Sequence, residues 1–286
     1  MDNLIKKIRE NIKQIKNDAI HRYYDLRINK VKEPFRVKFR KEPYKIVFIL
    51  GHMRSGSSLL TNILTSQPEI LGYGETHLQY ASEFDFKRLM FKLYWKTQEF
   101  KSLQDLKKLR MNHKYIMDKV LHNSKIEDEN LLTNENLYAI FLVREPKRTI
   151  ASILDLKQDW SEEKALNCYL KRLSTLEKYS KLINNKERSL FVTYDQLINE
   201  TDLTFKALKN LLGTRSQFSE EYAVNKKTGV AGIGDPTEKI KAGRIVRKPR
   251  KLENTISIKS AEKGIKQFNN TCSTLSEYCS CLKNLN

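Results

Sequence analysis

The sequence contains little cysteine, glycine or proline. Its 286 residues include 4 cysteines, 10 glycines and 6 prolines. Four cysteines are too few for the disulfide framework of a small secreted domain, so we expect free thiols and a reducing compartment. Cys279 and Cys281 lack the spacing of zinc ligands, and we predict no metal site. The low glycine and proline content also excludes a collagen-like chain or a long disordered linker.

Long apolar runs are also missing. The longest, Ile46 to Leu50 and Ala139 to Val143, are far too short to cross a bilayer. The first ten residues, MDNLIKKIRE, place charges where the apolar core of a signal peptide would lie. These features predict a cytoplasmic protein without a transmembrane segment.

Charge of one sign is abundant. The chain has 53 Lys and Arg against 34 Asp and Glu, a formal net charge of +19. Such a field attracts polyanions, which include nucleic acid, anionic lipid, acidic glycan and nucleotides. Because lysine-rich solvated surfaces are also common, the charge alone does not choose among these functions.

The N-terminal 33 residues predict a basic amphipathic helix. Its apolar positions recur at steps of three and four: Ile5, Ile8, Ile12, Ile15 and Ala19. This stripe could dock on the body of the protein or on a second copy, giving a homodimer. A membrane-surface role is less well supported, because the stripe lacks the Trp and Phe anchors of such helices. We expect residues 44–286 to form one domain.

Three short apolar runs are each followed by a helical pattern, which is typical of an α/β fold. The expected strands are Lys45–Leu50, Tyr138–Val143 and Ser189–Tyr194; the expected helices run from Ser57 to near Pro68, past Ile150 and Ile153, and from Leu203 to Leu212, where Gly213 ends the helix. Residues 80–119 and 161–185 are also expected to be helical. The order predicts a central parallel sheet flanked by helices, with ligands at the carboxyl ends of the strands.

The loop after the first expected strand has the spacing of a phosphate-binding loop. Gly51 and Gly56 match G-x-x-x-x-G, but Ser57 stands where a nucleotide triphosphatase has its lysine. Glycines let backbone amides point at an anion, and the following helix N-terminus favours negative charge. Arg54 adds a fixed charge, and the remaining donors are Ser55, Ser57 and Ser58.

The segment Arg54-Ser-Gly-Ser-Ser58 resembles the 5′-phosphosulfate loop of the sulfotransferases that use 3′-phosphoadenosine-5′-phosphosulfate (PAPS). That family holds the 3′-phosphate with an Arg at a later strand end and a Ser eight positions on. Arg144 and Ser152 have this separation here, and a guanidinium can grip a phosphate with two hydrogen bonds.

Two further segments resemble the tyrosylprotein and carbohydrate branch of that family. Gly74-Glu75-Thr76-His77 resembles the segment with the catalytic Glu, and Met117-Asp118-Lys119 resembles the segment whose Lys supports the sulfonate. Tyr194 lies in a segment resembling the one beside the adenine. Residues 229–235 and the basic run Lys239–Lys251 resemble the late loop that closes over the nucleotide.

The resemblance implies a P-loop-like sulfotransferase fold that transfers a sulfuryl group from PAPS to a hydroxyl, leaves 3′-phosphoadenosine-5′-phosphate (PAP), and needs no metal. It implies Glu75 as general base, with Arg54 and Lys119 stabilising the developing charge. His77 is the alternative base, because its ordinary pKa lies near neutrality, and His113 is a weaker one.

Two other functions are open at the level of sequence. A P-loop nucleotide kinase or triphosphatase would need the lysine that Ser57 replaces. A nucleic-acid-binding protein would fit the charge but not the paired positions of Arg144 and Ser152, so we expect no nucleic-acid partner. The acceptor is not identified; a glycan or small hydroxyl metabolite fits the absence of an export signal better than protein sulfation in a secretory compartment.

Overall fold

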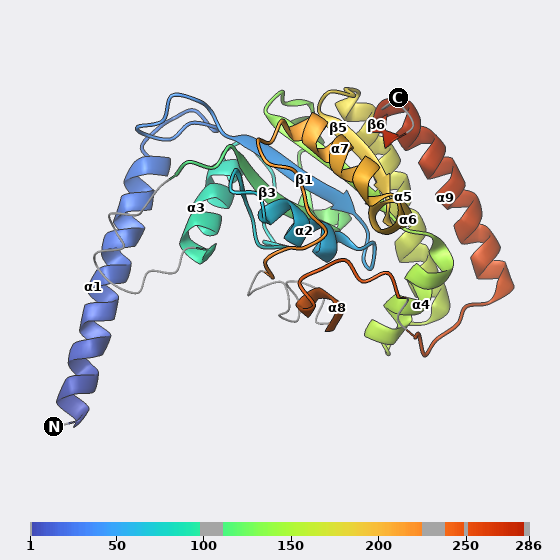
Figure 1. Cartoon of the computed structure of the whole chain (residues 1–286), viewed down its shortest axis with the longest axis horizontal. Coiled ribbons are helices and arrows are strands. Elements are labelled where there is room, and N and C mark those ends of the chain that lie inside the picture. The colour runs from blue at the N-terminus through green and yellow to red at the C-terminus, as the bar shows by residue number, and fades with distance from the viewer. Residues whose placement is uncertain (1, 98–110, 225–237, 249–250, 283–286) are drawn as a thin grey trace.

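A six-stranded, wholly parallel sheet forms the centre of the molecule (Figure 1). The computed structural model describes residues 2–97, 111–224, 238–248 and 251–282. The strands are β1 (Lys45–Gly51), β2 (Ile70–Leu71), β3 (Tyr115–Val120), β4 (Leu137–Val143), β5 (Ser189–Thr193) and β6 (Ser280–Cys281). Their order is β2-β3-β1-β4-β5-β6, so the first strand lies between β3 and β4.

Helices cover both faces of this sheet. They are α1 (Asp2–Ile28), α2 (Ser57–Thr65), α3 (Asp85–Thr97), α4 (Pro146–Leu156), α5 (Glu162–Ile183), α6 (Tyr194–Asn199), α7 (Thr201–Leu212), α8 (Glu238–Lys241) and α9 (Ile258–Tyr278), with short 3₁₀ turns η2 (Asn123–Lys125) and η3 (Glu129–Thr133). Alternate residues of β1 belong to two cores. Phe48 lies in the core that contains residues of α1, α3, α4, α5 and α9, and Ile49 lies in the core that contains residues of α2, α6, α7 and α8. A strand buried on both faces explains the continuous apolar run in the sequence.

The α/β class and the three expected strands are confirmed, and each strand leads into a helix at the same edge of the sheet. Glu145 caps α4 by accepting from the amides of Lys147 and Arg148. Thr193 caps α6 in a capping box with Gln196. Tyr194 is therefore the first residue of α6 rather than the last of β5.

The prediction that residues 80–119 are helical is wrong at its end. Only α3 is a helix in the described part of this stretch, and Tyr115–Val120 is the strand β3. The polar pair Asp118 and Lys119 hid the strand, because polar side chains are rare in a strand buried on both faces. Both residues are buried here. Burial of Asp118 is tolerated because its carboxylate accepts hydrogen bonds from the neighbouring Thr76 and Tyr80.

Helix α1 meets the body through its second half. Ile20, Tyr24 and Ile28 are buried against α3, while the first half extends away from the sheet (Figure 1). Four isoleucines of the predicted stripe are 43–65% exposed: Ile5, Ile8, Ile12 and Ile15. For these residues the expectation that the stripe docks on the body is wrong, and contact with a second copy stays a prediction. No helix in the described ranges is long and apolar enough to cross a membrane.

The contact between α9 and α4 gives a test of the packing. A methyl group added at Gly264 would lie 2.6 Å from Cβ of Pro146. Gly to Ala in a helix ordinarily stabilises by about 1 kcal/mol, but here we expect Gly264→Ala to lower the free energy of unfolding by about 1–3 kcal/mol, as overpacking does. Urea unfolding measures this change. Ser273→Ala, at an exposed position of α9, is the control and should not destabilise; equal stability of the two variants would contradict the packing.

Candidate active site

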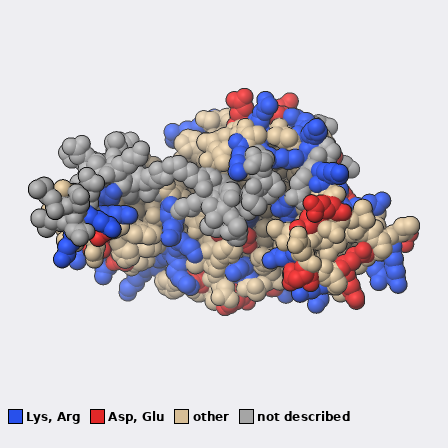
Figure 2. Space-filling model, turned by 90° about the horizontal axis from the view of Figure 1, so that it is seen from below, with Lys and Arg blue, Asp and Glu red and all other residues tan. Residues whose placement is uncertain are grey.

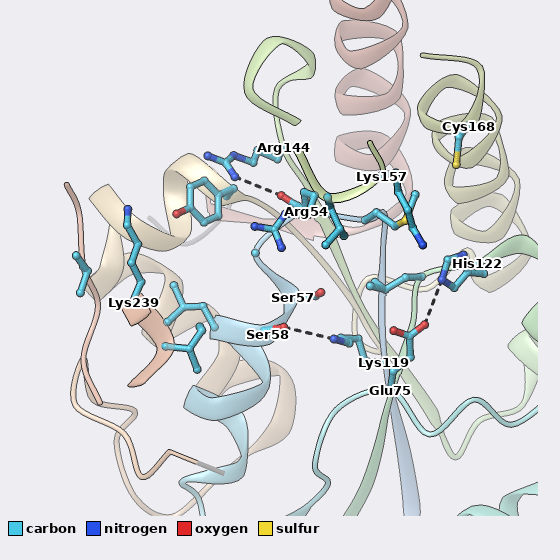
Figure 3. Close-up of a pocket in the computed structure, with 18 of the residues that line it drawn as sticks. Arg54, Ser57, Ser58, Glu75, Lys119, His122, Arg144, Lys157, Cys168 and Lys239 are labelled. Atoms are coloured by element: carbon cyan, nitrogen blue, oxygen red, sulfur yellow. Dashed lines mark hydrogen bonds and ion pairs between the residues drawn. The ribbon is translucent and has the colours of Figure 1, made fainter. Parts of the chain in front are cut away.

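Two adjoining cavities open at the carboxyl ends of β1, β3 and β4. The first has a volume of about 580 Å³ and the second about 600 Å³. Both are lined by Arg54, Arg144, Tyr194 and Lys239, so they form one continuous site. Glu75 is the one carboxylate on the described wall of the first cavity. Figure 3 shows its side chain across the cavity from Arg54 and Arg144.

The loop between β1 and α2 forms the floor where the cavities meet. Gly56 has φ of 93°, and a Cβ there would lie 2.3 Å from the Tyr194 ring, so glycine is required for both conformation and space. Ser57 begins α2, and Ser57 and Ser58 line the first cavity. The N-terminus of a nine-residue helix therefore opens toward a concave, cation-rich surface, as in anion-binding loops.

Two predicted loop residues do not reach the cavity wall. The Ser55 side chain is fully buried, and its hydroxyl makes no hydrogen bond within the described residues. Gly51 lies beneath the loop, and a Cβ there would meet Ser55 Oγ at 2.9 Å. Ser55 and Gly51 therefore belong to the loop through their backbones, and their side-chain positions lie beneath the cavity wall.

Arg54, Arg144 and Ser152 come together although the last two are far from the loop in sequence. Arg54 Nε donates to Ser152 Oγ at 2.8 Å, and Arg144 Nη1 donates to the Arg54 carbonyl at 3.3 Å. The Arg144 guanidinium lies 4.1 Å from the centre of the Tyr194 ring, a cation–π contact. Burial lowers the pKa of Arg144, and the group stays charged near neutral pH. This arrangement is suited to a phosphate dianion.

His52 connects the loop to the end of β4. Its Nε2 accepts from the Arg144 amide at 3.0 Å, and its Nδ1 lies 2.9 Å from the Met53 carbonyl. Because Nε2 accepts, Nδ1 carries the proton and donates. Burial lowers the pKa of His52 to about 4, so the ring is neutral at physiological pH. No local sequence pattern indicates this contact, which spans 92 residues.

Glu75 is held in place by its neighbour Thr76. Asp118 on β3 accepts from the Thr76 amide at 2.9 Å, from the Thr76 hydroxyl at 2.6 Å and from the Tyr80 hydroxyl at 2.6 Å. Burial raises the pKa of Glu75, and the charge of Lys119 opposes this rise. A carboxylate with a raised pKa beside a cation is suited to accept a proton.

Lys119 follows Asp118 and lies on the same wall as Glu75. Its Nζ is 3.4 Å from Ser58 Oγ at the start of α2, which places the ammonium between the loop and the carboxylate (Figure 3). The backbone amide of Lys119 donates to Asp118 at 2.8 Å, so one buried carboxylate orders both segments.

The two other candidate bases differ in position. His77 lines the first cavity, and its backbone has φ of 60°. His113 does not line it: its Nδ1 lies 3.0 Å from the Tyr94 hydroxyl, and burial lowers the pKa of the ring to about 4. His77 therefore stays a candidate, whereas His113 is outside the site.

Besides His52, the site depends on His122 and Arg172, which were not predicted from the sequence. His122 Nε2 lies 3.4 Å from Glu75 Oε1. Arg172 of α5 is buried under the cavity and donates to the carbonyls of Gly51 and Val120 at 2.7 and 2.6 Å and to Asn123 Oδ1 at 3.0 Å. The signal for His122 was its place two residues after a strand, which required β3 to be recognised.

The basic run near the C-terminus contributes to both cavities. Lys239 and Arg244 line the first, and Arg247 lines the second, where it pairs with Glu220. Residues 229–235, which we expected to belong to a closing loop, lie outside the described residues.

One comparison with known proteins identifies a family. A family model described as "Sulfotransferase family" matches residues 47–218, more than half of the chain. A search of curated proteins found no significant match. Among solved structures, the chain is similar to mouse sulfotransferase SULT7A1 complexed with PAP, at 15% identity over 81% of this chain and 84% of that chain, with a TM-score of 0.49.

Two further structures show the same level of similarity. One is a sulfotransferase domain from the curacin biosynthetic pathway, at 14% identity over 84% of this chain and 100% of that chain, with a TM-score of 0.42. The other is retinol dehydratase in complex with androsterone and the inactive cofactor PAP, at 12% identity over 86% and 83%, with a TM-score of 0.41.

Arg172 gives a stability test of the site. Arg172→Met would leave the carbonyls of Gly51 and Val120 and the Asn123 side chain without their donor. Since each unsatisfied buried group costs about 1–3 kcal/mol, we expect the free energy of unfolding to fall by about 3 kcal/mol or more. Chemical denaturation measures this, with the exposed neighbour Lys171→Met as control. If the free energy of unfolding fell no more than in the control, the hydrogen bonds of Arg172 would not stabilise the fold.

Proposed function

This chain belongs to the sulfotransferase family, and we propose that it transfers the sulfuryl group of PAPS to a hydroxyl acceptor, using Glu75 as the general base. The observation that carries the proposal is the convergence of Arg54, Arg144 and Ser152 beside a phosphate loop without a lysine. PAPS carries phosphate at both the 3′ and 5′ positions, and two joined cavities with cations on each fit such a molecule.

The residues divide the binding work between the two cavities. Arg144 and Ser152 would hold the 3′-phosphate in the second cavity, since both line it. The amides and hydroxyls at Ser57 and Ser58 would hold the 5′-phosphate, where the helix N-terminus adds partial positive charge. Tyr194, which already contacts the Arg144 guanidinium, would border the nucleotide.

Glu75 is the proposed base because its position and its environment agree. It lines the first cavity, and burial raises its pKa toward the range in which a carboxylate accepts a proton effectively. PAPS, when bound, supplies an activated sulfuryl group. Arg54 and Lys119 would stabilise the negative charge that builds up during transfer, as fixed cations do in phosphoryl transfer.

We propose that the acceptor is a small hydroxyl compound or the terminal sugar of a glycan. The wall of the cavity that Glu75 lines also includes Met53, Leu121 and Trp160. An indole ring beside a polar group is suited to the flat apolar face of a ring that carries a hydroxyl. Figure 2 shows that Lys and Arg are spread over the visible described surface with Asp and Glu among them, so the charge supplies no separate argument for nucleic acid.

Calorimetric titration with PAP tests the cofactor class directly. We expect binding without metal and much weaker binding of ATP with magnesium. Arg144→Ala should weaken PAP binding about tenfold or more, because hydrogen bonds to charged groups contribute about 1.5–3 kcal/mol. Lys147→Ala, at an exposed position of α4 outside both cavities, is the control. A preference for magnesium ATP would refute the proposal and favour a kinase or triphosphatase.

Replacing the proposed base separates catalysis from binding. Glu75→Gln should lower kcat by about 10²–10⁴-fold, the usual contribution of a general base, while PAP affinity changes little. In the native enzyme, kcat should fall as the pH drops through the raised pKa of Glu75, since only the carboxylate accepts a proton. Both kcat and its pH dependence are obtained from rates of sulfuryl transfer measured across a pH series. If His77→Asn abolished transfer and Glu75→Gln did not, His77 would be the base.

A further inference from the structure

Glu75 and His122 form a pair that the known motifs do not include. Glu75 Oε1 is buried and makes no hydrogen bond of good geometry among the described residues, and His122 Nε2 lies 3.4 Å from it. The Glu75 side chain is 11% exposed and that of His122 is 44% exposed. Figure 3 shows the imidazole on the cavity wall with its ring directed at the carboxylate. A buried acceptor atom facing a possible donor is a place where small movements complete a hydrogen bond.

We infer that His122 is a positioning residue for Glu75: its Nε2–H holds Oε1 and leaves Oε2 to face the acceptor hydroxyl. The inference rests on the proposed role of Glu75 as the base. His122 itself forms no bond with the reacting atoms in this account.

The backbone around His122 is fixed independently of Glu75. Arg172 donates to the Val120 carbonyl at 2.6 Å and to the Asn123 side chain at 3.0 Å, so it grips the chain on both sides of His122. Arg172 also holds the Gly51 carbonyl at the start of the phosphate loop, at 2.7 Å. The chain segment that carries His122 is therefore held relative to the loop as well as to β3.

The segment that carries Glu75 is anchored just as firmly from its other side. Asp118 accepts hydrogen bonds from both the amide and the hydroxyl of Thr76, the residue after Glu75. The two members of the pair are thus brought together by two separate buried groups, Asp118 and Arg172. Geometry imposed from both sides is a feature of residues that must stay aligned during a reaction.

The charges around the pair favour a neutral imidazole. Burial lowers the pKa of His122, and the positive charges that face it act in the same direction: Arg172 from α5, Lys125 from η2, Lys119 from β3, and His77 when protonated. For Glu75, burial raises the pKa, Asp118 acts in the same direction, and Lys119, His77 and Lys125 oppose it. The lowered pKa of His122 favours a neutral ring near neutral pH, and the N–H of that ring can donate to the Glu75 carboxylate.

This arrangement predicts how the Glu75 pKa responds to changes at His122. A hydrogen bond to the charged form of a carboxylate lowers its pKa, so removing the donor raises it. In acid, the native imidazole also becomes a cation, which lowers the Glu75 pKa further. His122→Gln keeps an N–H near the position of Nε2 but cannot ionise, whereas His122→Leu can neither donate nor ionise. The Glu75 pKa should rise in the order native, His122→Gln, His122→Leu.

The test uses the full chain bound to PAP, with ¹³C-labelled glutamate carboxyl groups followed by NMR. The Glu75 signal is identified by its loss in Glu75→Gln. We expect His122→Leu to raise the Glu75 pKa by about half a unit or more, with His122→Gln in between. His21→Gln, on α1 and exposed, is the matched control and should leave it unchanged. His122→Asn, whose shorter amide cannot reach, replaces His122→Leu if the latter fails to fold.

The outcomes distinguish this inference from the proposed function. An unchanged Glu75 pKa in His122→Leu overturns the positioning role even if PAP binds and transfer proceeds. Failure of the native protein to bind PAP overturns the sulfotransferase proposal, and the carboxyl titration of the free protein still tests the pair. With an acceptor in hand, His122→Gln should keep kcat within about threefold of native, as a retained donor implies. If His122→Gln abolished transfer while Glu75→Gln did not, His122 would be the base, and the inference would be wrong.

Discussion

The site depends on the parallel register of β1 with its two neighbours. Leu50 pairs with Val120 on one side and with Phe141 on the other, so β1, β3 and β4 end at the same edge of the sheet. The carboxyl end of a parallel strand leaves carbonyls unpaired, and at this edge a single buried cation, Arg172, takes those of Gly51 and Val120. The phosphate loop after β1, Lys119 near the end of β3 and Arg144 after β4 therefore lie at three adjacent strand ends. Without this register, none of the predicted residues would meet.

Charge is organised at two depths around this edge. Arg172 and Asp118 are buried beneath the cavities, where hydrogen bonds to the chain satisfy them and fix its course. Arg54, Lys119 and Arg144 lie at the surface of the cavities, where an anionic ligand can complete their interactions. The net charge of +19 is therefore only partly a property of the site, and other positive charges lie on solvated surface such as α1, where Lys6, Lys7 and Lys13 are exposed.

Local patterns in the sequence were sufficient for the strand–loop–helix units. The apolar runs of β1, β4 and β5, Gly56 in the loop, and Arg144 at the end of β4 each have a signature within about ten residues. β3 was missed because Asp118 and Lys119 interrupt its apolar pattern. The burial of Asp118 is compensated by hydrogen bonds from Thr76 and Tyr80, 42 and 38 residues away. Arg172 and His52 could not be found for the same reason: their contacts reach across 121 and 92 residues and have no local pattern. The apolar periodicity of residues 5–19 correctly predicted a helix, α1, but periodicity does not specify what covers its apolar face.

The most direct test of the account is the structure of the protein crystallised with PAP. We expect the 3′-phosphate in contact with Arg144 and Ser152, and the 5′-phosphate at the start of α2 with Arg54 and Lys119 beside it and Glu75 facing the position of the transferred group. The account would be contradicted if PAP occupied another surface, or if its 3′-phosphate lay away from Arg144 with the 5′-phosphate outside the loop.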